Sequence, residues 1–217
     1  MTAIQQHIAS IRSTLPEGVT LISVSKFNPI SAIQEAYDAG ERDFGESHVQ
    51  ELIPKYEALP KDIRWHMIGH LQTNKVKQIV PFVHLIQSVD SIHLMEVIQK
   101  EAAKIGRTVN ILLEVHVAHE EAKSGFLPEE LPDALEALKR MPNIHLSGLM
   151  TMATNTDDEN EIRRCFRKAK ELMASCHLST PDYQLSIGMS SDYLLAIEEG
   201  STMVRIGSII FGERHYL

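Results

Sequence analysis

The chain has 217 residues, of which 43% are hydrophobic and 23% are charged, the balance of an ordinary soluble globular protein. Its net charge of -8 at pH 7 argues against a nucleic-acid partner, because a surface that follows phosphates needs a basic excess. No stretch approaches the roughly 20 apolar residues that span a bilayer, and the first residues lack the pattern of a signal peptide. We therefore expect one domain, residues 1–217, without membrane contact.

The two cysteines agree with a cytoplasmic location. Cys165 and Cys176 fall in one predicted helix, which separates them by about 16 Å and so prevents a disulfide. We expect two free thiols, as is usual in a reducing compartment.

The predicted elements begin with an amphipathic helix that ends at a Pro-Glu-Gly sequence. Its apolar stripe is formed by Ile4, Ile8, Ile11 and Leu15. Eight short apolar runs of β type follow, alternating with helical patterns. The runs cover residues 19–26, 42–46, 63–69, 83–89, 109–117, 144–152, 183–189 and 202–210.

This alternation predicts the fold. Parallel strands joined by crossover helices give a sheet buried on both faces, and eight repeats fit closure into a (β/α)8 TIM-type barrel. A doubly wound open sheet is the alternative, but no G-x-G-x-x-G motif follows the first run. In a barrel, functional residues are expected at the C-terminal ends of the strands.

Lys26 ends the first run and is the first candidate for such a site. Desolvation at a barrel mouth lowers the pKa of a lysine and makes its neutral amine available for imine formation with an aldehyde. On position alone, a lysine that extends to the surface at a strand end explains the residue as well.

The segments SIGMSSDY and MVRIGS are typical of phosphate-binding turns, because small residues at strand-to-helix junctions leave backbone N–H groups for an anion. Ser190 or Ser191 is expected to N-cap the helix that follows and to donate to a phosphate oxygen. Gly207 allows close approach of a phosphate, and Ser208 offers a hydroxyl. Simple helix capping is the alternative, although turns after the seventh and eighth strands match the usual phosphate site of these barrels.

Arg205 lies within the last apolar run and needs a partner if it is buried. Two partners are considered: a carboxylate such as Glu46 in the core, or a ligand acceptor such as a pyridine nitrogen.

Six motifs in the chain, in order from about residue 19 to 214, resemble the pyridoxal-phosphate homeostasis proteins (the YggS/PROSC family). They are VSKFNPISAIQEAYDAGERDFGESHVQEL, WHMIGHLQTNKVK, EEAKSGF, LSGLMTMA, LSIGMSSDY and STMVRIGSIIFGER. The resemblance implies a fold like the N-terminal barrel of alanine racemase. It also implies that pyridoxal 5'-phosphate (PLP) is the cofactor and that it forms a Schiff base with Lys26. The positions that hold the phosphate are then Ser190, Gly207 and Ser208, and Arg205 faces the pyridine nitrogen.

The signature H-x-I-G-x-L-Q-x-N-K, from His66 to Lys75, also matches the family and places His66 and Asn74 at the pocket rim. Met150, in LSGLMTMA, is a further candidate for cofactor binding, with core packing as its alternative. Ser47 stands where the family usually has Asn.

A carrier without catalytic activity is the function expected from this resemblance. An arginine at the pyridine nitrogen leaves that nitrogen unprotonated and weakens the ring as an electron sink. In alanine racemase, a tyrosine from a separate β domain is the second base, and this chain stops about seven residues after its last run. We expect a monomer that binds PLP. Apo-PLP enzymes or free amino acids are the expected acceptors of the cofactor.

The alternatives are a small PLP-dependent amino-acid racemase and an unrelated barrel enzyme without PLP. The racemase needs a second base, for which Tyr37, His66 and His116 are the candidates. No metal site is expected, because the H-x-x-x-H spacing of His66 and His70 crosses a strand end and not one face of a helix.

Overall fold

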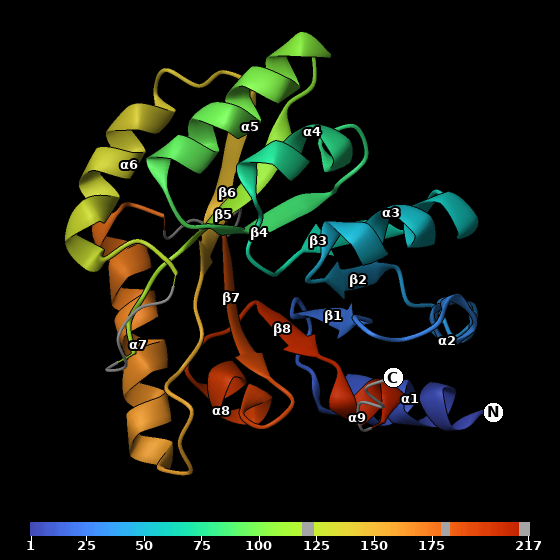
Figure 1. Ribbon diagram of the computed structural model, residues 1–217. Coiled ribbons are helices and arrows are strands. Elements are labelled where there is room, and N and C mark those ends of the chain that lie inside the picture. Colours follow the sequence, from blue (N-terminus) through green and yellow to red (C-terminus); the bar gives the residue numbers. More distant parts are fainter. Residues whose placement is uncertain (119–123, 179–182, 213–217) are drawn as a thin grey trace.

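In the computed structural model, residues 1–118, 124–178 and 183–212 are described; residues 120–123 of the motif EEAKSGF and 213–214 of the last motif lie outside them. Within the described residues, eight parallel strands close into a barrel in which each strand pairs with the next and the last pairs with the first (Figure 1). The strands are β1 (Thr20–Val24), β2 (Asp43–Glu46), β3 (Arg64–Met67), β4 (Leu85–Val89), β5 (Val109–Glu114), β6 (Ile144–Met150), β7 (Gln184–Met189) and β8 (Met203–Ile206). The predicted (β/α)8 barrel is therefore confirmed.

Helices surround the barrel, and the first of them lies beside the last (Figure 1). The α-helices are α1 (Ala3–Thr14), α2 (Ile30–Asp38), α3 (Val49–Ala58), α4 (Val76–Ile79), α5 (Ile92–Lys104), α6 (Leu131–Leu138), α7 (Glu159–Ser175), α8 (Tyr193–Glu198) and α9 (Ser208–Phe211). Two 3-10 turns, η1 (Thr73–Lys75) and η2 (Pro128–Glu130), precede α4 and α6.

Helix α1 forms where the apolar stripe predicts it. The side chain of Thr2 accepts from the backbone of Gln5 and the Gln5 side chain accepts in return, so that two N–H groups at the start of the helix are satisfied. Ile8 and Ile11 are buried against the barrel. Cys165 in α7 and Cys176 at its C-terminal end are both free thiols, as the spacing predicts. No helix among the described residues is long and apolar enough to cross a membrane.

Each of the eight predicted runs contains a strand, but two of the runs extend three or more residues beyond the end of the strand. The last run predicts β structure to residue 210, whereas β8 ends at Ile206 and Ser208 begins α9. Ile210 is fully buried on this helix. Neighbouring apolar residues suit a short helix as well as a strand, so composition alone does not mark the boundary. The fifth run predicts β structure to residue 117, whereas β5 ends at Glu114.

Two apolar clusters stabilise the barrel. The larger one lies between the strands and the surrounding helices. The smaller one comes from five strands and fills the barrel interior; it consists of Ile22, Leu85, Leu112, Met150 and Met203. The side chains of a strand alternate between its two faces, so each of these five strands contributes to both clusters.

The turn between β7 and α8 depends on a glycine. Gly188 has φ of +94°, and a Cβ there would come within 2.6 Å of the Ala196 Cβ and 3.0 Å of the Tyr193 Cα. The strand can therefore pass this closely under α8 only without a side chain. The residues that follow, Ser190 and Ser191, are placed by this turn.

Replacing Gly188 tests how tightly the turn is packed. Gly40 is a matched control, because it has φ of +99° and a Cβ there would meet no atom within 4 Å. Both alanine variants incur the cost of a left-handed conformation, about 1 kcal/mol or more. Gly188→Ala should lower the free energy of unfolding by a further amount of about 1 to 3 kcal/mol, measured by urea unfolding, because the methyl group overpacks the turn. Equal losses in the two variants would show that the contact is relieved cheaply.

Candidate functional site

A cavity of about 460 Å³ opens at the C-terminal ends of β1, β2, β3, β6, β7 and β8. Five of the predicted site residues line it together: Lys26, Ser190, Arg205, Gly207 and Ser208. The remaining lining residues are Val24, Ser47, Ile68, Met152, Met189, Ser191 and Ile209. Residues almost the whole chain apart thus converge where the barrel fold predicts a site.

Three other predicted residues do not line this cavity. His66 is buried inside the barrel and not at the rim, because its place in β3 turns its side chain inward. Met150 belongs to the interior apolar cluster, in agreement with the core-packing alternative. Asn74 is exposed in η1. Sequence order alone does not separate the interior of a barrel from its rim.

Part of the signature around Asn74 lies at a neighbouring cavity of about 370 Å³. Gly69, Gln72 and Lys75 line it, and Ser47 is shared with the first cavity. A Cβ at Gly69 would lie 2.5 Å from the Ser47 carbonyl oxygen. The glycine of the signature therefore allows the segments after β2 and β3 to touch.

Lys26 lies two residues after the end of β1 and begins a tight turn. The next residue, Phe27, has φ of +65°, which is unusual for a residue with a side chain. Its backbone N–H donates to Glu51 Oε2 on α3 at 2.7 Å, and the Asn28 side chain donates to the Lys26 carbonyl oxygen at 3.1 Å. The backbone on both sides of the lysine is thus fixed by hydrogen bonds.

Arg205 is buried in β8 and is held by acceptors on β7 and in the segment that directly follows β6. Its Nη1 donates to the Ser186 carbonyl oxygen at 2.8 Å and to Ser186 Oγ at 2.7 Å, and its Nη2 donates to the Thr151 carbonyl oxygen at 3.0 Å. Burial lowers the pKa of Arg205 to about 10, so the side chain remains a cation at neutral pH. The expected alternative of a pair with Glu46 is wrong, because Glu46 faces outward and binds Lys55.

A chain of hydrogen bonds continues from Arg205 through the barrel interior. Ser186 Oγ donates to Gln87 Oε1 at 2.7 Å. The Gln87 amide nitrogen lies 3.1 Å from His66 Nδ1 and can only donate, which leaves the His66 Nε2–H to donate to Asp43 at 3.0 Å. Every bond runs in the same direction, from a buried cation to a carboxylate, so that each bond polarises the next.

The turns after β7 and β8 are joined to each other. The Gly207 N–H donates to Ser190 Oγ at 3.2 Å. The expectation that Ser190 or Ser191 caps the following helix is wrong: Asp192 is the N-cap residue of α8, and its Oδ1 accepts from the Met189 N–H at 2.6 Å. Asp192 therefore closes the turn, and the Ser190 hydroxyl is not used for helix capping.

Gly207 is required by the neighbouring strand. A Cβ there would lie 3.1 Å from the Val24 carbonyl oxygen and 3.3 Å from the Val24 Cβ. The glycine thus lets β8 and β1 approach each other where both border the cavity. The N–H groups of Ser208 and Ile209 begin α9 and have no acceptor within their own helix, so they suit an anion.

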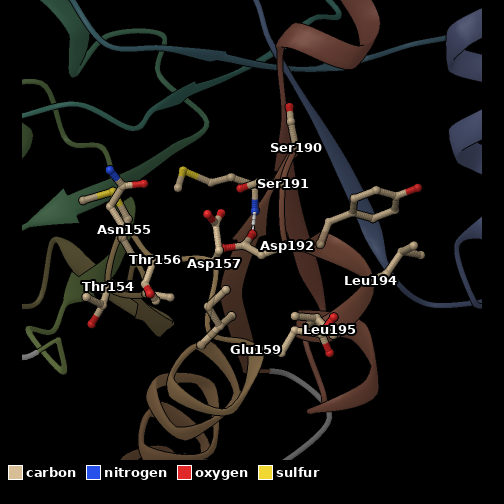
Figure 2. A pocket seen from close by; sticks show the side chains of 15 residues that line it. Thr154, Asn155, Thr156, Asp157, Glu159, Ser190, Ser191, Asp192, Leu194 and Leu195 are labelled. Carbon is tan, nitrogen blue, oxygen red and sulfur yellow. Dashed lines mark hydrogen bonds between the residues drawn. The ribbon is translucent and has the colours of Figure 1, made fainter.

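A second cavity, of about 630 Å³, adjoins the first and shares Met152, Met189, Ser190 and Ser191 with it. Figure 2 shows its two sides: the segment from Thr154 to Glu159 faces the residues that lead into α8. Neither Lys26 nor Arg205 lines it. The first cavity is therefore the one that combines the residues predicted for chemistry.

Sequence reasoning missed the residues that support Lys26 and Arg205. Ser186 and Thr151 accept from the guanidinium and Gln87 accepts from Ser186, yet little in their local sequence distinguishes them from ordinary strand residues. The one available signal is that Gln87 and Ser186 interrupt otherwise apolar strands, which indicates buried polar partners.

Residues 1–215 match the family described as alanine racemase, N-terminal domain. The chain is 43% identical over 201 residues to the pyridoxal phosphate homeostasis protein of Aquifex aeolicus, which covers 90% of this chain and 87% of the relative. It is 36% identical over 229 residues to the pyridoxal phosphate homeostasis protein of Mus musculus, covering 98% of this chain and 84% of the relative.

Solved structures share the fold. PipY of Synechococcus elongatus with PLP bound superposes with a TM-score of 0.88 at 39% identity, covering 96% of this chain and 100% of that one. Alanine racemase from E. faecalis superposes with a TM-score of 0.81 at 19% identity, covering 97% of this chain and 58% of that one. The second likeness concerns the fold alone.

Asp43, at the end of the interior chain, makes stability depend on pH. Burial raises the pKa of its carboxyl, but hydrogen bonds from His66 and Arg64 more than offset this and hold the pKa well below its ordinary value. The stabilisation is therefore fully present above the ordinary carboxyl pKa and is lost as pH falls toward the folded-state pKa.

Asp43→Asn should accordingly lower the free energy of unfolding by about 2 kcal/mol at neutral pH, and by less below about pH 4. Urea unfolding of the variant and the native chain across this range measures the difference. Asp133→Asn, on the exposed side of α6, controls for the change in net charge. Parallel curves for Asp43→Asn and the native chain would contradict the assignment.

Proposed function

The chain belongs to the family of the alanine racemase N-terminal domain and, within it, to the pyridoxal phosphate homeostasis proteins, and on this premise we propose that it holds PLP on Lys26 as a Schiff base. The observation that supports this most directly is the convergence of Lys26, Arg205 and the serine turns on one cavity. Its role is then to hold and release the cofactor.

The residues of the cavity fit the three reactive ends of PLP. The amine of Lys26 suits the aldehyde, and the hydroxyls of Ser190 and Ser208, with the N–H groups that begin α9, suit the phosphate. Arg205 suits the pyridine nitrogen as a donor, since it lines the cavity and carries five N–H groups, of which three hydrogen bonds to protein acceptors use only part. The volume of about 460 Å³ lies within the range of small-molecule sites.

Bound PLP supplies an electrophilic aldehyde and a ring that accepts electrons. Arg205 limits the second property. With a pKa of about 10, it stays protonated at neutral pH and keeps the pyridine nitrogen as a hydrogen-bond acceptor. The interior chain that ends at Asp43 holds the guanidinium in place for this role.

The absence of catalysis is supported by the composition of the cavity. Among the described residues that line it, the titratable side chains are Lys26 and Arg205. Tyr37, considered as a second base, donates to Asp62 on the outside of the barrel at 2.8 Å, and neither His66 nor His116 lines the cavity. Within the part of the chain that the structure describes, a proton transfer opposite Lys26 therefore lacks a side chain in the cavity to perform it.

The proposed role is thus PLP homeostasis: the chain binds PLP and releases it to amines. Apo-PLP enzymes and free amino acids are the acceptors that we propose, because both carry an amine that can take over the aldehyde. Two free thiols fit a cytoplasmic location, and we propose that the chain acts as a monomer.

The covalent bond to Lys26 has a spectroscopic test. The purified protein with PLP should absorb in the near-visible range, and borohydride should fix the label on Lys26. Lys26→Ala should lose this band, whereas Lys75→Ala, at the neighbouring cavity, should keep it. A band that persists in Lys26→Ala, or a label on another lysine, would refute the assignment.

The absence of turnover is tested with the holoprotein and each L-amino acid in deuterated water. The α-proton signal and the chirality of the amino acid should both stay constant, because the described residues that line the cavity include no second base. Sustained exchange accompanied by racemisation would favour the small racemase instead.

A further inference from the structure

Lys55 is a second lysine close to the proposed cofactor site, on the helix that packs behind Lys26. It is 6% exposed, unusually little for a lysine. We propose that Lys55, together with Glu46 and Glu51, is a positioning device that holds the turn of Lys26 and so presents its amine for Schiff-base formation. This inference rests on the proposed role of Lys26.

The ammonium group of Lys55 is fully engaged. Its Nζ donates to Glu46 Oε1 at 2.7 Å, to Glu51 Oε2 at 3.2 Å and to the Ser25 carbonyl oxygen at 3.0 Å. A lysine has three donors, and all three are used here. Lys55 is therefore a structural cation that holds its neighbours and does not compete with Lys26 for an aldehyde.

The two carboxylates that bind Lys55 also hold the chain on each side of Lys26. Glu46 Oε1 accepts from the Ser25 hydroxyl at 2.6 Å, and Glu51 Oε2 accepts from the Phe27 N–H at 2.7 Å. Ser25, before Lys26, is thus held through its side chain and its carbonyl group. Phe27, after Lys26, is held through its backbone N–H.

The turn needs such support because it is strained. Phe27 has φ of +65°, a conformation that residues with a side chain adopt only when their surroundings enforce it. The hydrogen bond to Glu51 requires the Phe27 N–H to point toward α3, which the left-handed conformation provides. Releasing this bond allows the backbone to relax and moves the side chain of Lys26.

Stability alone does not account for this buried cluster. Glu46 is fully buried, and its Oε2 has no hydrogen-bond partner among the described residues. A buried ion pair with an unsatisfied oxygen contributes little net stability, and an apolar pair of the same size is often as stable. The contact of the cluster with the turn of Lys26 explains why buried charges are present at this place.

A second cluster on the same strand provides a control. Arg12 donates to Glu41 at 2.7 Å, and Glu41, also fully buried, accepts from the Ser23 hydroxyl at 3.1 Å. This arrangement repeats that of Lys55, Glu46 and Ser25 two residues earlier on β1, but it touches no residue of the turn. Arg12→Met therefore removes a cation, 52% exposed where the Lys55 side chain is 7% exposed, from another ion pair with a buried glutamate that does not contact the turn of Lys26.

The step that depends on position is imine formation. The amine nitrogen of Lys26 bonds to the aldehyde carbon of PLP, and the carbonyl oxygen leaves as water with the two hydrogens of the amine. The rate of this step depends on how the amine is held, because a displacement of about 1 Å can cost a hundredfold. Phosphate binding, by contrast, depends on the turns after β7 and β8.

Two probes separate these contributions: PLP, and pyridoxine 5'-phosphate, whose alcohol cannot form an imine. Stopped-flow absorbance gives the rate of imine formation, and titration gives the dissociation constant of each probe. Lys55→Met should slow imine formation and weaken PLP binding by about tenfold or more, and change the affinity for pyridoxine 5'-phosphate by less than about twofold. Arg12→Met should leave both unchanged.

Glu51 provides a second test if Lys55→Met does not fold, since Glu51 is only partly buried. Glu51→Ala should slow imine formation as Lys55→Met does. Glu51→Gln keeps a carbonyl acceptor for the Phe27 N–H and should restore most of the rate. Failure of this rescue would contradict the role of the turn.

The remaining outcomes are distinguishable. Equal losses for PLP and pyridoxine 5'-phosphate would show general damage to the cavity and overturn the positioning role. Normal imine formation in both Lys55→Met and Glu51→Ala would overturn it as well, with the proposed function intact. A native chain that forms no bond to Lys26 would refute the proposed function itself.

Discussion

The alternation of side chains along the barrel strands is the constraint on which the site depends. On β1, Ile22 joins the cluster inside the barrel, whereas Ser23 and Ser25 point outward to buried carboxylates on neighbouring elements. Lys26 follows at the mouth, where the pairing of β1 has ended. A shift of one residue would bring the serines into the apolar interior and turn the lysine toward the helices. The register of β1, fixed by its pairs with β2 and β8, therefore determines which chemistry faces the cavity.

The charged groups that support the site are held by chains of hydrogen bonds and not by isolated pairs. Arg205 is connected to Asp43 through the side chains of Ser186, Gln87 and His66, and Lys55 connects two carboxylates to the turn of Lys26. Buried polar groups are costly unless each is satisfied, so such chains specify one arrangement of the side chains. The first chain ends at Arg205, which lines the cavity, and the second at Ser25 and Phe27, which flank Lys26. Both arrangements fit a rigid site.

Much of the fold could be predicted because its strands and helices each show the local apolar periodicity of their type. Eight apolar runs separated by helical patterns predict the barrel, and the barrel rule then brings Lys26, Arg205 and the serine turns together. The supporting contacts could not be predicted in this way, since Ser186 and Gln87 are 99 residues apart and meet only in the packed barrel. The resemblance places His66 at the rim, whereas the structure places it in the interior, three hydrogen bonds from Arg205 in the hydrogen-bonded chain. A motif can therefore identify a residue near a site without showing whether it lines the cavity or lies inside the barrel below it.

The composition of the cavity also favours release of the cofactor. The groups suited to the phosphate are hydroxyls and backbone N–H groups, and the cations among the described lining residues are Lys26 and Arg205, which suit the other two ends of PLP. A phosphate held by neutral donors is bound less tightly than one held by a guanidinium or ammonium group. Asp192, the nearest carboxylate in the turn after β7, is already committed to the Met189 N–H. Under the proposed function, a reversible bond to Lys26 would contribute a large share of the retention, and an incoming amine that replaced it would leave the cofactor held by the weaker contacts.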